Sequence, residues 1–84
     1  MSQATSNQRL SLRGLRTFCV AAEHGSFREA ADALFITASA VSHQIKNLEQ
    51  ELGQPLFDRL TRSVVLTVSG QSLYEDVRPL ISEL

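Results

Sequence analysis

The chain has 84 residues, of which 43 % are hydrophobic and 20 % are charged, so we expect one small folded domain with little room for an enzyme pocket. This composition excludes a disordered chain. The net charge of −1 counts against nucleic-acid binding through bulk charge, so a basic contact surface would require an uneven distribution of charge.

The charges are in fact distributed unevenly along the chain. Three of the nine acidic residues lie in the C-terminal segment, at positions 75, 76 and 83. Four of the eight basic residues lie in the middle of the chain, namely Arg28, Lys46, Arg59 and Arg62. They predict a modest anion-binding surface whose affinity falls with salt.

Cysteine and histidine are too few for a disulfide or a metal site. Cys19 is the only cysteine, and its setting in FCVAA indicates a packed core. His24 and His43 are too far apart in sequence to form a recognisable metal site with it. No apolar run approaches the roughly 18 residues of a membrane span, and the polar start MSQATSNQ lacks the apolar centre of a signal peptide, so the expected location is the cytoplasm.

Two helices are predicted after a polar N-terminal arm at residues 1–9. Ser11 offers an N-cap for the first helix, and Gly25 is expected to end it in a left-handed conformation. Ser26 then begins the second helix with a capping box, in which the Ser26 hydroxyl and the Glu29 carboxylate satisfy each other's backbone donors. Apolar residues recur at helical spacing in both segments: Leu12, Leu15, Phe18, Cys19 and Ala22, then Phe27, Ala30, Ala31 and Leu34.

The third predicted helix runs from a cap at Thr37 to Gly53 and has two contrasting faces. The apolar face consists of Val41, Ile45, Leu48 and Leu52. The opposite face carries Ser39, Ser42, His43 and Lys46, whereas the acids are confined to the last turn. Such a face is typical of contact with an anionic partner, and an ordinary solvated face is the alternative. Because only about three residues separate it from the second helix, the pair predicts a helix-turn-helix.

The segment LFDRLTRSVVLT, which follows Pro55, predicts a two-stranded hairpin. Val64 and Leu66 alternate with their neighbours after a polar corner at residues 61–62. The hairpin would form a wing beside the third helix. An arginine at a hairpin tip is commonly only solvated, but Arg59 and Arg62 follow a recognition-type helix, and this order favours contact with a neighbouring groove or phosphate.

The last segment carries an apolar stripe at spacings of four, three and four. The stripe consists of Leu73, Val77, Leu80 and Leu84, with Ile81 beside it. It would either pack on the domain's own core, form half of a dimer seam, or be the start of a helix in a longer chain. Its continuation to the final residue favours the last two explanations. Pro79 lacks a backbone donor and is expected to kink the helix.

Taken in order, these motifs resemble the N-terminal DNA-binding domain of the LysR-type transcriptional regulators, from Leu15 to about Tyr74. The motifs are G-S-F at 25–27, A-A at 30–31, S-A-V-S at 39–42, L-E at 48–49, L-G at 52–53, L-F at 56–57 and R-x-x-R before L-T at 66–67. No single motif suffices, but all occur in the right order and spacing. The phrase SAVSHQI is similar to the branch of this family that contains the glycine-cleavage activator.

The resemblance implies a mainly α fold with a winged helix-turn-helix over residues 10–68 and a linker helix over 69–84. The third helix, at 37–52, would enter the major groove of double-stranded DNA, and the wing at 59–62 would touch the adjacent backbone or minor groove. The linker helix would pair with a second copy in a homodimer. A small-molecule effector would act only through a sensor domain that is absent from these residues.

Carried over position by position, the resemblance assigns DNA contacts to three sets of residues. The base-facing set is Ala38, Ser39, Ala40, Ser42 and His43; the phosphate set is Ser26, Arg28, Thr37 and Lys46; the wing set is Arg59 and Arg62. Many relatives have Gln-Pro at positions 38–39 and Arg at position 43. Without that amide and that guanidinium, fewer direct hydrogen bonds to base edges are expected. Recognition would then depend more on apolar contacts, serine hydroxyls and DNA shape.

Two other classes of function fit the sequence less well. An enzyme would need a nucleophile, a base and an orienting acid in a recognisable arrangement, and the sequence shows none. A winged fold used only for protein–protein interaction or dimerisation is the main alternative. The net negative charge favours that alternative, and the polar, cation-bearing third helix opposes it. No cofactor and no membrane contact are expected.

Overall fold

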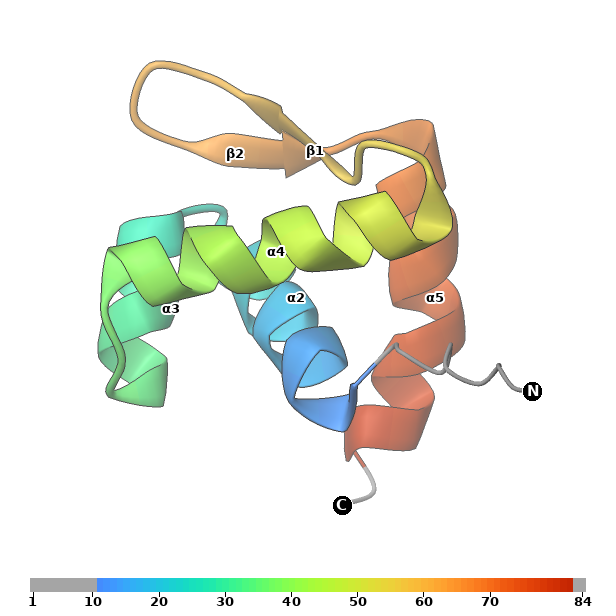
Figure 1. Ribbon diagram of the computed structural model, residues 1–84, viewed down its shortest axis with the longest axis horizontal. Helices are drawn as coiled ribbons and strands as arrows, with labels where there is room; N and C mark the ends of the chain where they lie inside the picture. Colours follow the sequence, from blue (N-terminus) through green and yellow to red (C-terminus); the bar gives the residue numbers. More distant parts are fainter. Residues whose placement is uncertain (1–10, 83–84) are drawn as a thin grey trace, which may run out of the picture.

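The computed structural model describes residues 11–82, which form four helices and a two-stranded hairpin. In chain order these elements are α2 (Leu12–His24), α3 (Phe27–Leu34), α4 (Ala38–Leu52), β1 (Phe57–Arg59), β2 (Val64–Leu66) and α5 (Val68–Ser82). Figure 1 shows α4 crossing α2, with α3 near one end of α4, α5 near the other, and the hairpin above them. The predicted winged helix-turn-helix with a following helix is therefore confirmed. The predicted arm at residues 1–9 and Leu84 lie outside the described residues.

Each of the three core helices begins at a hydroxyl side chain. Ser11, Ser26 and Thr37 each accept a hydrogen bond from the backbone N–H three residues later, at 3.0, 3.1 and 3.0 Å. These bonds satisfy donors that have no partner inside a helix. Gly25 and Gly53 end α2 and α4 in the left-handed conformation, with φ of 66° and 71°. The three predicted N-caps and the two predicted glycine ends, those of α2 and α4, are therefore confirmed.

The second helix differs from its prediction at its first turn. The Ser26 hydroxyl accepts from the Glu29 N–H as predicted, but the Glu29 carboxylate lies 3.6 Å from Nδ1 of His24. Only half of the predicted capping box therefore forms. His24 ends the preceding helix, so it lies near enough to compete for this carboxylate.

The turn between α3 and α4 consists of three residues, as predicted. It begins at Phe35, which has a φ of 60° and a side chain that is 93 % exposed. A left-handed conformation costs an ordinary residue about 1–2 kcal/mol. It allows the Ile36 N–H to reach the carbonyl of Ala31 at 3.0 Å, which closes α3 and directs the chain into α4.

The hydrophobic core lies between the four helices and the hairpin. Its largest fully buried side chains are Phe18, Val41, Ile45 and Leu56. The ring of Phe18 lies 5.5 Å from that of Phe57 and 6.4 Å from that of Tyr74, so one side chain of α2 joins the wing and α5 to the core. Removal of such a ring typically costs about 3–5 kcal/mol.

The wing is an antiparallel hairpin in which Phe57 faces Leu66 and Arg59 faces Val64. Phe57 and Val64 are buried against the helices, whereas the side chains of residues 60–63 are exposed. We call residues 60–63 the wing tip, and we call residues 54–57 with 67–70 the wing root. The root includes the start of α5.

A carboxylate of α4 holds one side of the wing root. Oε2 of Glu49 accepts hydrogen bonds from the backbone N–H of Leu56 at 2.7 Å and of Phe57 at 3.4 Å. A well-formed hydrogen bond to a charged acceptor contributes about 1.5–3 kcal/mol, and the longer contact to Phe57 should contribute little. Glu49 thus fixes the backbone at the start of the wing relative to α4. The sequence had indicated only that this acid lies away from the contact face.

A threonine joins the other side of the wing root to α5. Thr67 donates its backbone N–H to the Leu56 carbonyl at 3.0 Å and its hydroxyl to the Pro55 carbonyl at 2.7 Å. The same hydroxyl accepts from the Gly70 N–H at 3.0 Å. A Cβ at Gly70 would lie 2.1 Å from the Leu56 carbonyl oxygen, so only glycine fits there.

Helix α5 packs along α2. The Tyr74 hydroxyl donates to Oε2 of Glu23 at 3.1 Å, and Nε of Arg78 lies 3.7 Å from the same oxygen. Val77 is buried beneath them. The helix continues through Pro79 to Ser82, so the proline does not end it.

Candidate nucleic-acid interface

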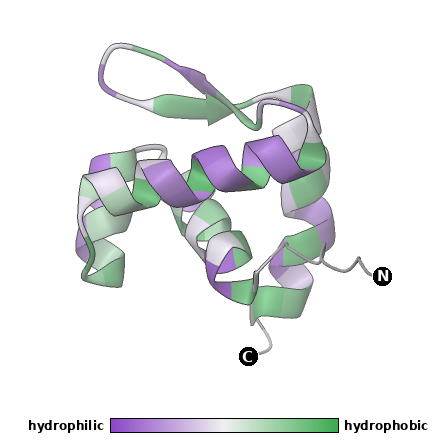
Figure 2. Cartoon of the chain, in the orientation of Figure 1, coloured by the Kyte–Doolittle hydropathy of each residue, from purple (hydrophilic) through white to green (hydrophobic). Residues whose placement is uncertain are grey.

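The exposed face of α4 carries the residues predicted to meet bases. Ala38, Ser39 and His43 are exposed, and Ala40 and Ser42 are half-buried. The direction of this face is fixed because Val41, Ile45 and Leu48 on the opposite side are buried in the core. Figure 2 shows hydrophilic and hydrophobic residues alternating along α4, as expected for a helix with one buried and one exposed face.

Two further residues of this face were missed by the sequence interpretation. Nδ2 of Asn47 lies 3.3 Å from Nε2 of His43, and Gln50 is exposed one turn later. Both follow His43 at helical spacing, by four and by seven residues, and this spacing was the signal that would have found them. Amide groups beside an imidazole supply donors and acceptors suited to base edges.

The two hydroxyls predicted to contact phosphate, those of Ser26 and Thr37, are helix caps. Each accepts one hydrogen bond from the backbone, from Glu29 and Ala40 respectively. A hydroxyl that accepts in this way keeps its own proton, which remains able to donate to a phosphate oxygen. The two roles are therefore compatible.

Arg59 of the wing lies over an aromatic ring of α3. Its guanidinium carbon is 4.9 Å from the centre of the Phe27 ring, and that ring meets Phe57 edge-on at 5.3 Å. A cation over an exposed aromatic face gains about 0.5–1 kcal/mol. The sequence did not predict this stack, which holds Arg59 beside α3 while leaving its N–H groups available.

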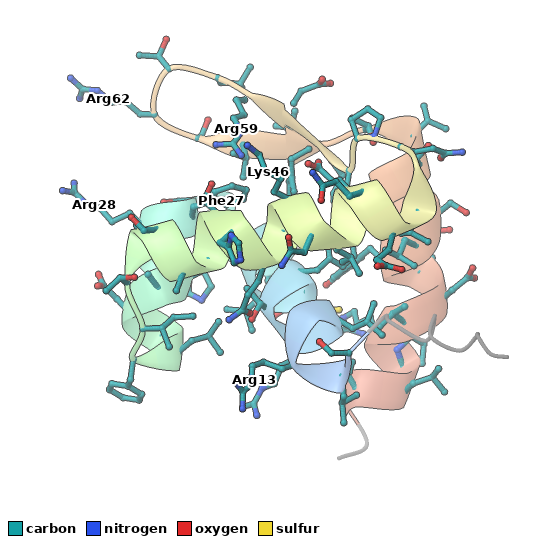
Figure 3. All side chains as sticks on the ribbon, in the orientation of Figure 1. Arg13, Phe27, Arg28, Lys46, Arg59 and Arg62 are labelled. Atoms are coloured by element: carbon teal, nitrogen blue, oxygen red, sulfur yellow. The ribbon has the colours of Figure 1, made fainter. Side chains whose placement is uncertain are left out.

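Most of the predicted phosphate and wing residues surround one cleft. This cleft of about 490 Å³ separates the N-terminal end of α3 from the wing tip and is lined by Ser26, Arg28, Arg59 and Arg62, among others. Figure 3 shows Arg28 and Arg62 projecting in the same direction from α3 and the wing, with Lys46 rising from α4 toward the wing. Cations from three elements thus border the same side of α4.

The apolar stripe of α5 does not form one free seam. Val77 belongs to the domain's own core, and Leu73 and Ile81 are packed partly against that core. Leu80 is 69 % exposed. The dimer contact predicted for Val77 stays a prediction; the structure shows this side chain covered by the domain's own core. Among the described residues of the stripe, Leu80 is the one that remains largely free.

The thiol of Cys19 is buried in the core. Burial, followed by the nearby Glu23 carboxylate, raises the pKa of the Cys19 thiol to about 11. No group of three metal-ligating side chains occurs among residues 11–82. Within the same range, no helix is both long and apolar enough to cross a bilayer.

These features define a winged helix-turn-helix protein, in which α4 has an exposed polar face and a cationic wing lies beside it. Residues 12–71 match the model of the family described as "Bacterial regulatory helix-turn-helix protein, lysR family". Because this match covers well over half of the chain, the protein belongs to the lysR family of bacterial helix-turn-helix regulators. The family predicted from the sequence is confirmed.

Similar proteins include several named transcriptional regulators. The glycine cleavage system transcriptional activator of Escherichia coli is 52 % identical over 73 residues, which cover 87 % of this chain and 24 % of that protein. The transcriptional activator AmpR of Pseudomonas aeruginosa is 52 % identical over 64 residues, which cover 76 % of this chain and 22 % of that protein. The chain thus spans about a quarter of the length of these relatives.

Solved structures of similar shape include complexes with DNA. The crystal structure of the "CbnR_DBD-DNA complex" has a TM-score of 0.82 and 32 % identity, and the match covers 86 % of this chain and 83 % of that chain. The "BenM_DBD/catB site 1 DNA Complex" has a TM-score of 0.81 and 42 % identity, with coverage of 87 % and 78 %. Both agree with the winged helix-turn-helix architecture.

Proposed function

We propose that this chain binds double-stranded DNA sequence-specifically, as the DNA-binding domain of a transcription regulator. The observation that carries the proposal is the exposed polar face of α4, which is bordered by cations from α3, α4 and the wing. An α-helix with such a face fits the major groove, and arginines beside it neutralise phosphates. The lysR family membership and the two similar structures solved with DNA support the same function.

The residues of the interface have three distinct roles. Base edges meet Ala38, Ser39, Ala40, Ser42 and His43; phosphates meet Ser26, Arg28, Thr37 and Lys46; the wing contributes Arg59 and Arg62. Arg62 at the exposed tip reaches the backbone or minor groove. Arg59 has the additional role of supporting the wing through its stack on Phe27.

We further propose that the chain acts as a homodimer through α5. Leu80, the largely exposed residue of the stripe on α5, provides the apolar contact. A small-molecule effector acts through a sensor domain outside this chain, and the role of the chain itself is binding rather than catalysis, in the cytoplasm. The lysR family membership and the DNA-bound neighbours oppose the alternative of a module used only for protein–protein interaction.

A selection from random duplexes tests the proposed function. The full chain is used to enrich a pool of random double-stranded oligonucleotides, and the enriched duplex is then compared with a scrambled one by fluorescence anisotropy between 50 and 300 mM salt, roughly the range in which phosphate contacts are resolved. Specific binding that weakens steeply with salt is expected. A dimer should also enrich two half-sites related by two-fold symmetry.

Two results would count against the proposal. Equal affinity for the enriched and scrambled duplexes would remove sequence specificity. No binding to either duplex at the lowest salt would remove DNA binding altogether and favour the protein-interaction alternative.

A substitution at Leu80 tests the dimer separately. Because this side chain is largely exposed, Leu80→Asp should leave the monomer folded while reducing the sedimenting mass to that of one chain. An unchanged mass would exclude α5 as the dimer contact. The matched control is Val68→Asp, at a similarly exposed apolar residue on a different side of α5, which should not change the mass.

A further inference from the structure

The first turns of α2 carry two arginines that the assigned interface does not use. Arg13 and Arg16 are both exposed and lie three residues apart, so they are neighbours on the helix surface. Among residues 11–82, neither arginine lies within ion-pair distance of a carboxylate, in contrast to Arg78, which lies 3.7 Å from Glu23. Two arginines without a neighbouring acid form a positively charged patch.

This patch borders α4. Thr17, one turn after Arg13, donates its hydroxyl to Oε1 of Gln44 at 2.6 Å, which fixes the middle of α2 against α4. Arg13, Arg16 and Gln44 line one cleft of about 210 Å³. A second cleft, lined by Gln44, Asn47 and Gln50 of α4 among others, continues along the same boundary. The arginines of α2 therefore adjoin the side of α4 that bears its exposed amides.

The position of the patch is opposite to that of the wing. Figure 3 shows Arg13 on one side of α4 and Arg59 and Arg62 of the wing on the other. The exposed face of α4 is thus flanked by two separate groups of cations. The group on the wing side includes Arg28, Arg59 and Arg62, and the group on the α2 side is Arg13 and Arg16.

The geometry of DNA gives the second group a partner. The major groove is about 12 Å wide and has a phosphate backbone on each side, so a helix lying in it is flanked by both strands. The wing-side cations can neutralise only the strand near them. We propose that Arg13 and Arg16 bind backbone phosphates of the opposite strand, so that the protein contacts both sides of the groove. This inference rests on the proposed placement of α4 in the major groove.

Arg13→Gln and Arg16→Gln, made singly in the full chain, test the proposal by anisotropy titration. Removal of either guanidinium should weaken binding about fivefold at 0.15 M salt and make the slope of log K against log salt less negative by about 0.9 per protomer. The enriched and scrambled duplexes should be affected equally, because phosphates carry no sequence. Arg78→Gln is the matched control: it removes the same charge near the other end of α2, and it should change neither quantity.

Duplexes with single neutral methylphosphonates locate the phosphate that each arginine binds. At one position the unmodified chain should lose about fivefold in affinity, whereas Arg13→Gln should lose nothing further. That position should lie on the strand opposite to the one at which Arg62→Ala shows the same coupling. Thermal unfolding of each variant, expected to match that of the unmodified chain, shows that the fold is retained.

Four outcomes would overturn the inference. Unchanged affinity and salt slope in both variants would exclude phosphate binding by the two arginines. An equal change in Arg78→Gln would show that the loss of affinity comes from net charge alone. Coupling of Arg13 and Arg62 to the same strand would contradict the two-sided arrangement. If the unmodified chain binds no DNA, the proposed function and this inference fail together; if it binds but the variants are unaffected, only the inference fails.

Discussion

The wing root and the wing tip belong to one hairpin but are held in different ways. At the root, Glu49 and Thr67 bind the backbone of residues 55–57, and Gly70 fits closely against Leu56. At the tip, the Leu60 N–H donates to the Ser63 carbonyl at 2.8 Å, and the side chains are exposed. The root should therefore determine stability and the tip should determine binding.

The largest expected effect is that of a methyl group added at the root. In Gly70→Ala the new Cβ would meet the Leu56 carbonyl oxygen at 2.1 Å, so the backbone must move. We expect a loss of about 3 kcal/mol and a fall in Tm of roughly 12–24 °C, measured by thermal unfolding. Gly53→Ala is the control. The added Cβ would meet no atom within 4 Å, so the loss of stability should be about 1 kcal/mol, from the left-handed φ alone. Equal losses of stability in the two variants would show that the close contact at Gly70 does not destabilise Gly70→Ala.

The next effect concerns the carboxylate that holds the root. Glu49→Ala removes the acceptor of two backbone donors and should cost about 2 kcal/mol in urea unfolding, with faster amide exchange at Leu56 and Phe57. Glu49→Gln keeps one acceptor oxygen and should cost about half as much. Glu51→Ala, on the exposed side of the same helix, should stay within about 0.5 kcal/mol of the unmodified chain. If Glu51→Ala were as costly as Glu49→Ala, net charge rather than hydrogen bonding would explain the result.

At the tip we expect the reverse pattern. Arg62→Ala should leave the free energy of unfolding within about 0.5 kcal/mol, while reducing the salt slope of DNA binding by about one unit on every duplex. Ser42→Ala on α4 should instead reduce discrimination between enriched and scrambled DNA. Anisotropy titrations with both duplexes check the two variants together. A loss of discrimination in Arg62→Ala would assign the tip to base readout.

The smallest effect expected is on the reactivity of Cys19. Burial raises its pKa from 9.0 to about 11, so at pH 8 the folded chain holds less thiolate than the unfolded chain, and alkylation should be slow until the pH rises toward that value. Wing-root variants should speed labelling at pH 8 by increasing the unfolded fraction, whereas Arg62→Ala should leave the rate within about twofold. Rapid labelling of the unmodified chain would contradict a closed core around this thiol.

The sequence predicted the parts of the fold that depend on local chemistry. Ser11, Ser26 and Thr37 cap the helices, Gly25 and Gly53 end them, and the helical spacing of apolar residues identified the buried face of α4. The hairpin was predicted from its alternation and turn residues. These signals lie within a few residues of the structure that they specify.

Interactions between distant segments were not predictable in the same way. The bond from Leu56 to Glu49, the stack of Arg59 on Phe27 and the bond from Thr17 to Gln44 depend on how the helices pack. The packing of Val77 could not be predicted either, because an apolar stripe has the same spacing whether it packs on its own domain or on a partner. For the candidate site, spacing predicted which face of α4 is exposed, but placing Arg13 beside α4 required the packed structure.

The single residue between the wing and α5 has a mechanical consequence. Strand β2 ends at Leu66 and α5 begins at Val68, so Thr67 is the whole connection between them. Its hydroxyl is hydrogen-bonded both to the Pro55 carbonyl, which precedes β1, and to the Gly70 N–H in the first turn of α5. A connection of one residue, held by the two hydrogen bonds of its hydroxyl and by two of its backbone groups, leaves little freedom of movement between the wing and α5. We therefore expect the wing to turn with α5 as one lever, so that a small rotation of the helix is delivered to the DNA as a displacement of Arg62.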